Sequence, residues 1–254
     1  MVMLWGAALA GVGGIVGIVA VTVGGGVTLG VPLLLLLGQP AATAIATIKF
    51  ALIGSFATGA LMHGGNRETA VEVPWLLWPL CVLGSVAGSL LITGLDERFL
   101  KILVVVLMAA VLWITYRTDL SAVPVRPAGE GRRIPPLGVA VVFGLCVYSG
   151  FFGAGFGTFL IFALMRFFGL SFVQSASVMT RINLLVVGSS VATFASKGTI
   201  DFQLGVPLLL GCALGGAMGT WTVKTLSPAV MKSMFLVFSV LLGSKLLWDA
   251  MAPL

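Results

Sequence analysis

The chain has 254 residues, of which 59% are hydrophobic and only 9% are charged, and its mean hydropathy is +1.16. Soluble domains carry about 25% charged residues, so this composition excludes an ordinary soluble protein and predicts an all-α, multi-pass membrane protein. The formal net charge of +6 would favour nucleic acid as the partner of a soluble protein. Here the basic residues are scattered between apolar runs, so we expect a lipid bilayer as the partner and no nucleic acid.

A membrane-spanning helix needs roughly 20 predominantly apolar residues. Apolar runs of about this length recur along the chain and predict transmembrane helices at Leu4–Val23, Ala41–Met62, Pro74–Thr93, Phe99–Tyr116, Leu137–Phe152, Ser171–Ala195, Leu204–Val223 and Ala229–Trp248. The first run lacks the basic start and the polar cleavage region of a signal peptide, so we expect it to remain in the protein.

Two further apolar runs, Val27–Leu37 and Thr158–Phe168, are too short to span a bilayer. At about 11 residues each, they cover only half of a hydrocarbon layer of roughly 30 Å. Each follows a glycine-rich break, the first at Gly24–Gly26 and the second at Gly153–Gly157. Because glycine destabilises helix interiors, this pattern predicts a discontinuous or re-entrant half-helix after each break.

The polar segment 117–136 carries four arginines and four prolines and divides the chain near its middle. The positive-inside rule predicts that this linker is cytoplasmic. It separates a first transmembrane repeat, residues 1–116, from a second, residues 137–254. We refer to these as the first and second halves.

The two halves share a pattern of residues that indicates an internal duplication. A shift of 131 or 132 positions superimposes matching glycines and basic residues over both halves. The matched pairs are Gly24 and Gly155, Gly26 and Gly157, Gly38 and Gly169, Ala44 and Ala176, Lys49 and Arg181, Gly84 and Gly215, Gly88 and Gly219, Leu95 and Leu226, and Lys101 and Lys232. Glycine matches alone are common in a chain with 34 glycines, but the shared spacing and the basic pairs favour duplication.

The orientation of the two repeats depends on how the broken segments cross the membrane. If each half crosses four times, the repeats are parallel. If each broken pair returns to its own side, each half crosses three times and the repeats are inverted, a plan typical of transporters. The inverted arrangement fits the positive-inside rule slightly better, because it moves Lys224 and Lys232 to the cytoplasmic side, while Lys197 moves to the outside.

Lys49 and Arg181 are basic residues within predicted spans, at positions that match between the halves. A charge at that depth costs a few kcal/mol, and no acidic residue lies deep in a span to pair with either one. One interpretation is that a small anionic substrate is the missing partner. The other is that these side chains reach an interface or cap backbone carbonyls.

The glycine breaks suggest an anion site for a second reason. A half-helix that starts after a break presents backbone N–H groups and the positive end of its dipole, which together favour an anion. Close helix packing through small residues is the alternative, and we prefer it for Gly84, Gly88, Gly215 and Gly219. The candidate substrate-binding residues are therefore Gly24, Gly25, Gly26, Thr47, Lys49, Gly153, Gly155, Gly157, Thr180, Arg181 and Asn183.

No signature of an enzyme is present in the sequence. It lacks nucleotide-binding and metal-binding motifs, a Ser-His-acid arrangement and a buried carboxylate pair. The three cysteines have no metal-ligand spacing and are interpreted as small core residues. We expect no catalytic activity, no cofactor and no metal.

The motifs Val23-Gly-Gly-Gly-Val-Thr-Leu-Gly-Val-Pro32 and Ala44-Ile-Ala-Thr-Ile-Lys49 resemble the first half of the TauE/SafE family of sulfite and organosulfonate exporters, also called the toluene-sulfonate uptake permease group. Gly150–Gly157, Arg181 and Lys197-Gly-Thr-Ile-Asp201 resemble its second half. The resemblance implies an inner-membrane transporter of small anions that is built from two repeats. Many members carry serine near position 48, where this chain has Ile48, so the preferred anion does not follow from the resemblance.

The sequence leaves three hypotheses for function. The first is a secondary transporter that exports sulfite or a sulfonate such as sulfoacetate or a taurine-related compound. The second is a passive channel for a small anion or neutral solute, and the third is a structural membrane subunit. A homodimer and a monomer are both compatible with the sequence.

Overall fold

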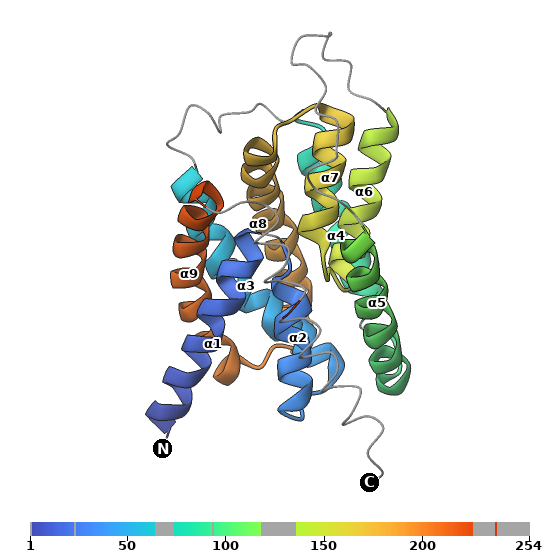
Figure 1. The fold of residues 1–254 in the computed structure, drawn as a ribbon. Coiled ribbons are helices and arrows are strands. Elements are labelled where there is room, and N and C mark those ends of the chain that lie inside the picture. Colours follow the sequence, from blue (N-terminus) through green and yellow to red (C-terminus); the bar gives the residue numbers. More distant parts are fainter. Residues whose placement is uncertain are drawn as a thin grey trace.

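The structure is a computed structural model that describes residues 2–22, 24–63, 74–92, 94–117, 136–225 and 237. Within these residues it is entirely helical, with no strand, and the helices form one bundle (Figure 1). The helices are α1 (Val2–Thr22), α2 (Gly26–Leu36), α3 (Ala41–His63), α4 (Leu77–Ile92), α5 (Glu97–Arg117), α6 (Pro136–Phe151), α7 (Phe156–Phe168), α8 (Phe172–Ser196) and α9 (Phe202–Thr225).

Each predicted apolar run that falls on described residues is a helix, with ends within a few positions of the prediction. By length and apolar composition, three helices of the described part can cross a membrane: Ala41–Met62, Phe172–Ser196 and Phe202–Trp221. The predicted span Ala229–Trp248 and most of the linker lie outside the described residues.

The two short runs form separate short helices, as predicted. Helix α2 has 11 residues and α7 has 13, and they lie toward opposite ends of the bundle in Figure 1. Because Gly26 lies against Leu52, and Gly30 lies against Ile48, α2 runs antiparallel to α3. The chain therefore turns back between the end of α2 and the start of α3, at residues 37–40.

Left-handed backbone conformations at the breaks explain why glycine is needed there. Gly24 precedes α2 with φ +72°, and Gly155, which matches it in the sequence pattern of the second half, precedes α7 with φ +67°. Residues with a Cβ atom rarely adopt these angles, whereas glycine adopts them at little cost.

Small residues allow two pairs of helices to pack with their backbones in contact. In the first pair, Gly215 lies on Gly14 and Gly219 lies on Ile18, so α9 runs parallel to α1. In the second pair, Gly84 and Gly88 lie on the backbone of α6, which runs parallel to α4. The predicted packing role of Gly84, Gly88, Gly215 and Gly219 is confirmed, since a methyl group on any of them would crowd a neighbouring helix.

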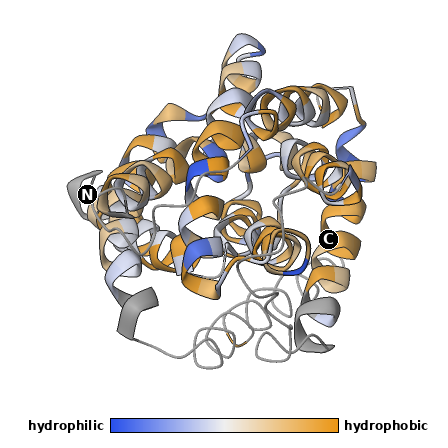
Figure 2. Cartoon of the chain, turned by 90° about the horizontal axis from the view of Figure 1, so that it is seen from above, coloured by the Kyte–Doolittle hydropathy of each residue, from blue (hydrophilic) through white to orange (hydrophobic). Residues whose placement is uncertain are grey.

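The surface of the bundle is suited to lipid. Hydrophobic residues predominate along the helices in the view from above (Figure 2). Large apolar side chains are exposed on the outer helices, as at Leu91 of α4, Ile102 of α5 and Leu214 of α9. The buried core holds mostly aliphatic side chains and glycine contacts.

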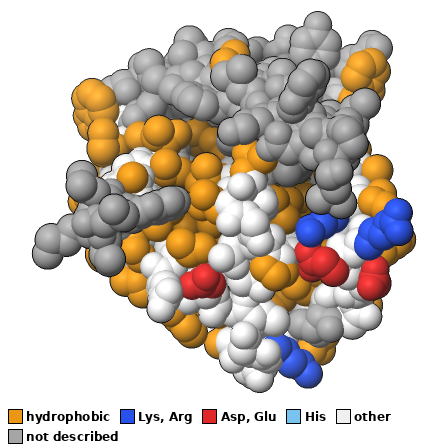
Figure 3. Space-filling model, turned by 90° about the horizontal axis from the view of Figure 1, so that it is seen from below, with side chains coloured by type: hydrophobic (Ala, Val, Ile, Leu, Met, Phe, Trp, Pro, Cys, Tyr) orange, Lys and Arg blue, Asp and Glu red, His pale blue; other side chains and the backbone are white. Residues whose placement is uncertain are grey.

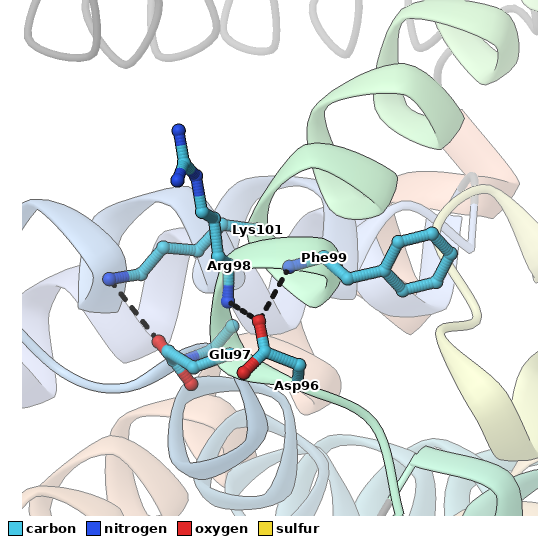
Figure 4. Close-up of polar contacts among 6 residues, drawn as sticks. Asp96, Glu97, Arg98, Phe99 and Lys101 are labelled. Carbon is cyan, nitrogen blue, oxygen red and sulfur yellow. Dashed lines mark hydrogen bonds and ion pairs between the residues drawn. The ribbon is translucent and has the colours of Figure 1, made fainter.

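Charged side chains gather on the lower face of the molecule (Figure 3). At the start of α5, Asp96 accepts hydrogen bonds from the N–H groups of Arg98 and Phe99, and Glu97 pairs with Lys101 at 3.2 Å (Figure 4). Glu97 also accepts a hydrogen bond from the N–H of Ala41 at 2.9 Å. These carboxylates cap the first turns of α5 and α3, where the helix dipoles favour negative charge.

Candidate functional site

The two glycine breaks meet inside the bundle. Gly24, in the first break, and Gly157, in the first turn of α7, face each other so closely that a Cβ atom on either would overlap the other's Cα. The sulfur of Met179 on α8 also lies against Gly157. The break of each half is therefore packed against the break of the other half, although the sequence separates them by more than 100 residues.

A threonine of the first half fixes the second break. The N–H of Gly155 donates a hydrogen bond of 3.1 Å to the hydroxyl of Thr28, which is fully buried in the first turn of α2. Within the second half, the Tyr148 hydroxyl donates to the carbonyl oxygen of Ala154 at 2.8 Å. These bonds satisfy polar backbone groups that would otherwise be buried without partners.

Lys49 holds the other end of the same break. Its Nζ donates hydrogen bonds to the carbonyl oxygens of Ser149, at 2.6 Å, and Gly150, at 2.5 Å. Both carbonyls belong to the last turn of α6, just before the break. The Phe194 ring of α8 lies 5.3 Å from Nζ, and the whole residue is only 1% exposed.

The surroundings of Lys49 explain how a buried cation is tolerated. The last carbonyls of a helix lack partners within that helix and carry the negative end of its dipole, so an ammonium group placed there is stabilised. The aromatic ring adds a favourable cation–π contact. Lys49 therefore makes the carbonyl contacts that the second interpretation of its sequence predicted, and it brings a positive charge to the edge of the second break.

Arg181 does not share a site with Lys49. Its Nη2 atom donates to the hydroxyl of Ser177 at 3.3 Å, and the side chain is only partly buried. Lys49 contacts Phe194 on the same helix, and at an α-helical rise of about 1.5 Å per residue Phe194 lies about 20 Å along α8 from Arg181. One small anion cannot contact both side chains in this conformation, so the expected two-cation site is not formed.

Of the three remaining polar candidates, Asn183 lies near the contact of the breaks, whereas Thr180 and Thr47 make other structural hydrogen bonds. Asn183 is buried one helical turn from Met179 and donates to its carbonyl oxygen at 3.1 Å, so it lies on the face of α8 that meets Gly157. Thr180 is buried, and its hydroxyl donates within α8 to Ala176. Thr47 accepts the N–H of Asp201 and so supports the start of α9, away from the breaks.

The candidate glycines Gly25, Gly26 and Gly153 belong to the breaks themselves. Gly25 is the N-cap residue of α2, and Gly26 packs against Ala20 and Leu52. Gly153 turns the chain after α6 with φ +82°.

Three residues that hold the second break were not among the candidates: Thr28, Tyr148 and Ser149. Thr28 could have been selected from the sequence, because a hydroxyl just after a glycine break is well placed to form hydrogen bonds with buried backbone groups. Ser149 contributes a carbonyl oxygen, which any residue could supply, so its side chain gave no signal.

This arrangement brings helix starts and one fixed cation into the same part of the bundle. Helices α2 and α7 both begin at the contact of the two breaks, so the positive ends of their dipoles converge there. Such helix starts attract negative groups without a dedicated side chain. In the described part of the chain, no group of His, Cys, Asp and Glu side chains could hold a metal ion.

Comparison with known proteins identifies the family. The sequence profile described as "Sulfite exporter TauE/SafE" matches residues 9–246. A "Probable membrane transporter protein" of Haemophilus influenzae Rd is 28% identical over 233 residues, which cover 89% of this chain and 88% of the relative.

Two further relatives cover similar shares. The "Probable membrane transporter protein YfcA" of Escherichia coli K12 is 24% identical over 89% of this chain and 84% of its own length. The "Probable membrane transporter protein ORF9" of Sinorhizobium sp is 26% identical over 94% of this chain and 91% of its own length. No solved structure gives a significant match. Because the family profile matches almost the whole chain, the protein belongs to the TauE/SafE family and is a membrane transporter rather than an enzyme.

Proposed function

We propose that the protein is a secondary transporter that exports small sulfur-containing anions, such as sulfite and sulfonates, across the bacterial inner membrane. The observation that carries this proposal is the contact of the two helix breaks, Gly24 on Gly157, at which two helix N-termini converge beside a buried lysine. The name of the family profile supports the choice of sulfite among small anions.

The anion binds beside the Gly24–Gly157 contact, since the two glycines leave no space between them. Backbone N–H groups at the starts of α2 and α7 are its main ligands, and Asn183 lies on the adjoining face of α8. Lys49 of α3 contributes the positive charge of its ammonium group, which lies at the end of α6. Arg181 acts at a separate position along the transport pathway. It lies about 20 Å along α8 from Phe194, the residue that contacts Lys49.

We further propose that the two halves are inverted repeats, as in many secondary transporters. The position of α2 and α7 toward opposite ends of the bundle favours inversion over a parallel arrangement. Three further observations support the equivalence of the two halves. Gly38 and Gly169, which follow the two half-helices, share left-handed φ angles of +81° and +67°. Ser85 pairs with Ser190, and their repeat counterparts Gly216 and Thr58 also lie in contact. Finally, the fourth helix of each half packs on the first helix of the other, as α4 on α6 and α9 on α1.

Transport can be tested with purified protein in liposomes loaded with unlabelled sulfite. A transporter accumulates radiolabelled sulfite transiently by exchange, and its rate saturates with concentration and rises with substrate on the opposite side. A passive channel shows neither saturable exchange nor stimulation from the opposite side. Taurine, sulfoacetate and sulfate as competitors define the preferred anion, and failure of every sulfur-containing anion to compete would contradict the proposal.

A further inference from the structure

Helix α8 contains a buried hydroxyl that has no hydrogen-bond partner. In the part of the chain that the structure describes, the Ser175 Oγ atom is the one buried side-chain oxygen or nitrogen in this situation, and the residue is fully buried. Buried hydroxyls in proteins normally have a partner, because burial without one costs stability. The unpaired hydroxyl of Ser175 therefore indicates a role other than helix packing.

Other buried hydroxyls of α8 bond to their own helix. Those of Thr180 and Ser190 each donate, at 2.8 Å, to the carbonyl oxygen four residues earlier. The corresponding acceptor for Ser175 is the carbonyl oxygen of Ser171, which accepts the N–H of Ser175 at 2.8 Å. The Ser175 hydroxyl does not form this bond, so it is available to donate to another group.

Ser175 lies close to the contact of the two glycine breaks. It precedes Met179 by one helical turn, so the two residues share a face of α8. The Met179 sulfur lies 3.2 Å from the position that a Cβ atom on Gly157 would occupy, in the first turn of α7. Because long side chains on a helix lean toward its N-terminus, the Met179 side chain extends toward the turn that contains Ser175. The unpaired hydroxyl and the start of α7 are therefore on the same side of α8.

The chemistry around this hydroxyl favours an anion as its partner. Helix α7 begins at Gly155 without a side-chain cap, so its first N–H groups and the positive end of its dipole favour a negative group. Neither α7 nor α8 contains an acidic residue that could take this place. An oxyanion of sulfur carries several oxygen atoms, so it can accept hydrogen bonds from backbone N–H groups and from a hydroxyl at the same time.

We propose that the Ser175 hydroxyl donates a hydrogen bond to an oxygen atom of the transported anion at the start of α7. This role rests on the proposed transport function and adds a side-chain ligand to it. Ser175 and Asn183 lie one turn before and one turn after Met179, so they flank the first turn of α7 from α8. Because the hydroxyl is paired only when the anion is bound, it contributes to affinity and not to the stability of the empty protein.

Ser175→Ala tests this role through two measurements on the purified protein, the melting temperature without sulfite and the dissociation constant for radiolabelled sulfite. We expect a melting temperature equal to or above that of the wild type, since removal of an unpaired buried hydroxyl removes its burial cost. We expect sulfite to bind about tenfold more weakly, as loss of a hydrogen bond to a charged group predicts.

Ser190→Ala is the matched control, because Ser190 is equally buried on the same helix but its hydroxyl is paired. It should melt at a lower temperature and bind sulfite as the wild type does. If Ser175→Ala melted as low as Ser190→Ala, or bound sulfite as tightly as the wild type, the role of Ser175 would be overturned while the proposed function stood. Absence of saturable sulfite binding by the wild type would contradict the proposed function and the role of Ser175 together.

Discussion

The backbones of Gly24 and Gly157 lie in direct contact, so the two glycine breaks pack against each other inside the bundle. Neither position has space for a side chain, and Gly24 also has a left-handed φ of +72°. The glycines therefore bring two helix starts together, and the convergence of those two dipoles creates a region suited to an anion.

The first prediction concerns this contact. Gly157→Ala places a methyl group into the Cα of Gly24 and should lower the stability of the protein by about 1–3 kcal/mol, as overpacking of a close contact does. Thermal unfolding in detergent measures the loss. Gly144→Ala is the matched control, because the space beside Gly144 is open and alanine favours the helix. Equal melting temperatures for Gly157→Ala and the wild type would contradict the close contact.

The second prediction concerns Thr28, which accepts the N–H of Gly155. Thr28→Val keeps the shape of the side chain but leaves that N–H buried without its partner, at a cost of about 1–3 kcal/mol. We expect a lower melting temperature and slower sulfite exchange. Thr193→Val, which removes a hydroxyl bond within α8 at a partly exposed position, should change both quantities much less. A larger effect of Thr193→Val than of Thr28→Val would refute this role.

The third prediction separates the charge of Lys49 from its packing. Lys49→Met fills similar volume but cannot donate to Ser149 and Gly150, so two helix-end carbonyls lose their partner. We expect a loss of about 1–3 kcal/mol, whereas Lys49→Arg, which retains a cation and donors, should lose less. Chemical unfolding of the three proteins tests the order. If Lys49→Met were as stable as the wild type, the carbonyl contacts would not stabilise the fold.

The fourth prediction follows from the two glycine interfaces. Gly88→Ala would crowd Val147 and Phe151 of α6, and Gly215→Ala would crowd Gly14 of α1. Because a Cβ atom at either position would lie 2.0 Å from a backbone oxygen of the neighbouring helix, both substitutions should lower the melting temperature by similar amounts. Gly188→Ala, at an open position of α8, serves as the control. A loss in only one of the two would show that the interfaces are not energetically equivalent.

Periodicity and glycine placement were sufficient to predict most of the helices. The short helices α2 and α7 were predicted because glycines interrupt runs that are otherwise continuous and apolar. Close helix packing at Gly84 and Gly215 was predicted, but the helices that pack there, α6 and α1, were not. Small residues indicate that another helix comes close without indicating which helix it is.

The candidate site was harder to predict, because its groups are mainly backbone atoms. Lys49 was selected from its depth in a span, and its contact with the Ser149 carbonyl could not be read from the identity of residue 149. Arg181 was grouped with Lys49 by its matching position in the sequence, but in the proposed inverted repeats matching positions lie on opposite sides of a symmetry axis. Equivalence in sequence therefore does not imply proximity.

Equilibrium binding of radiolabelled sulfite to the purified protein tests whether sulfite binds at the helix breaks. We predict saturable binding to the wild type and at least about tenfold weaker binding to Lys49→Ala, a loss that corresponds to about 1.4 kcal/mol. Lys197→Ala, which removes an exposed lysine after α8, should bind as the wild type does. Unchanged affinity in a folded Lys49→Ala protein, or no saturable binding by the wild type, would show that sulfite does not bind at the helix breaks beside Lys49.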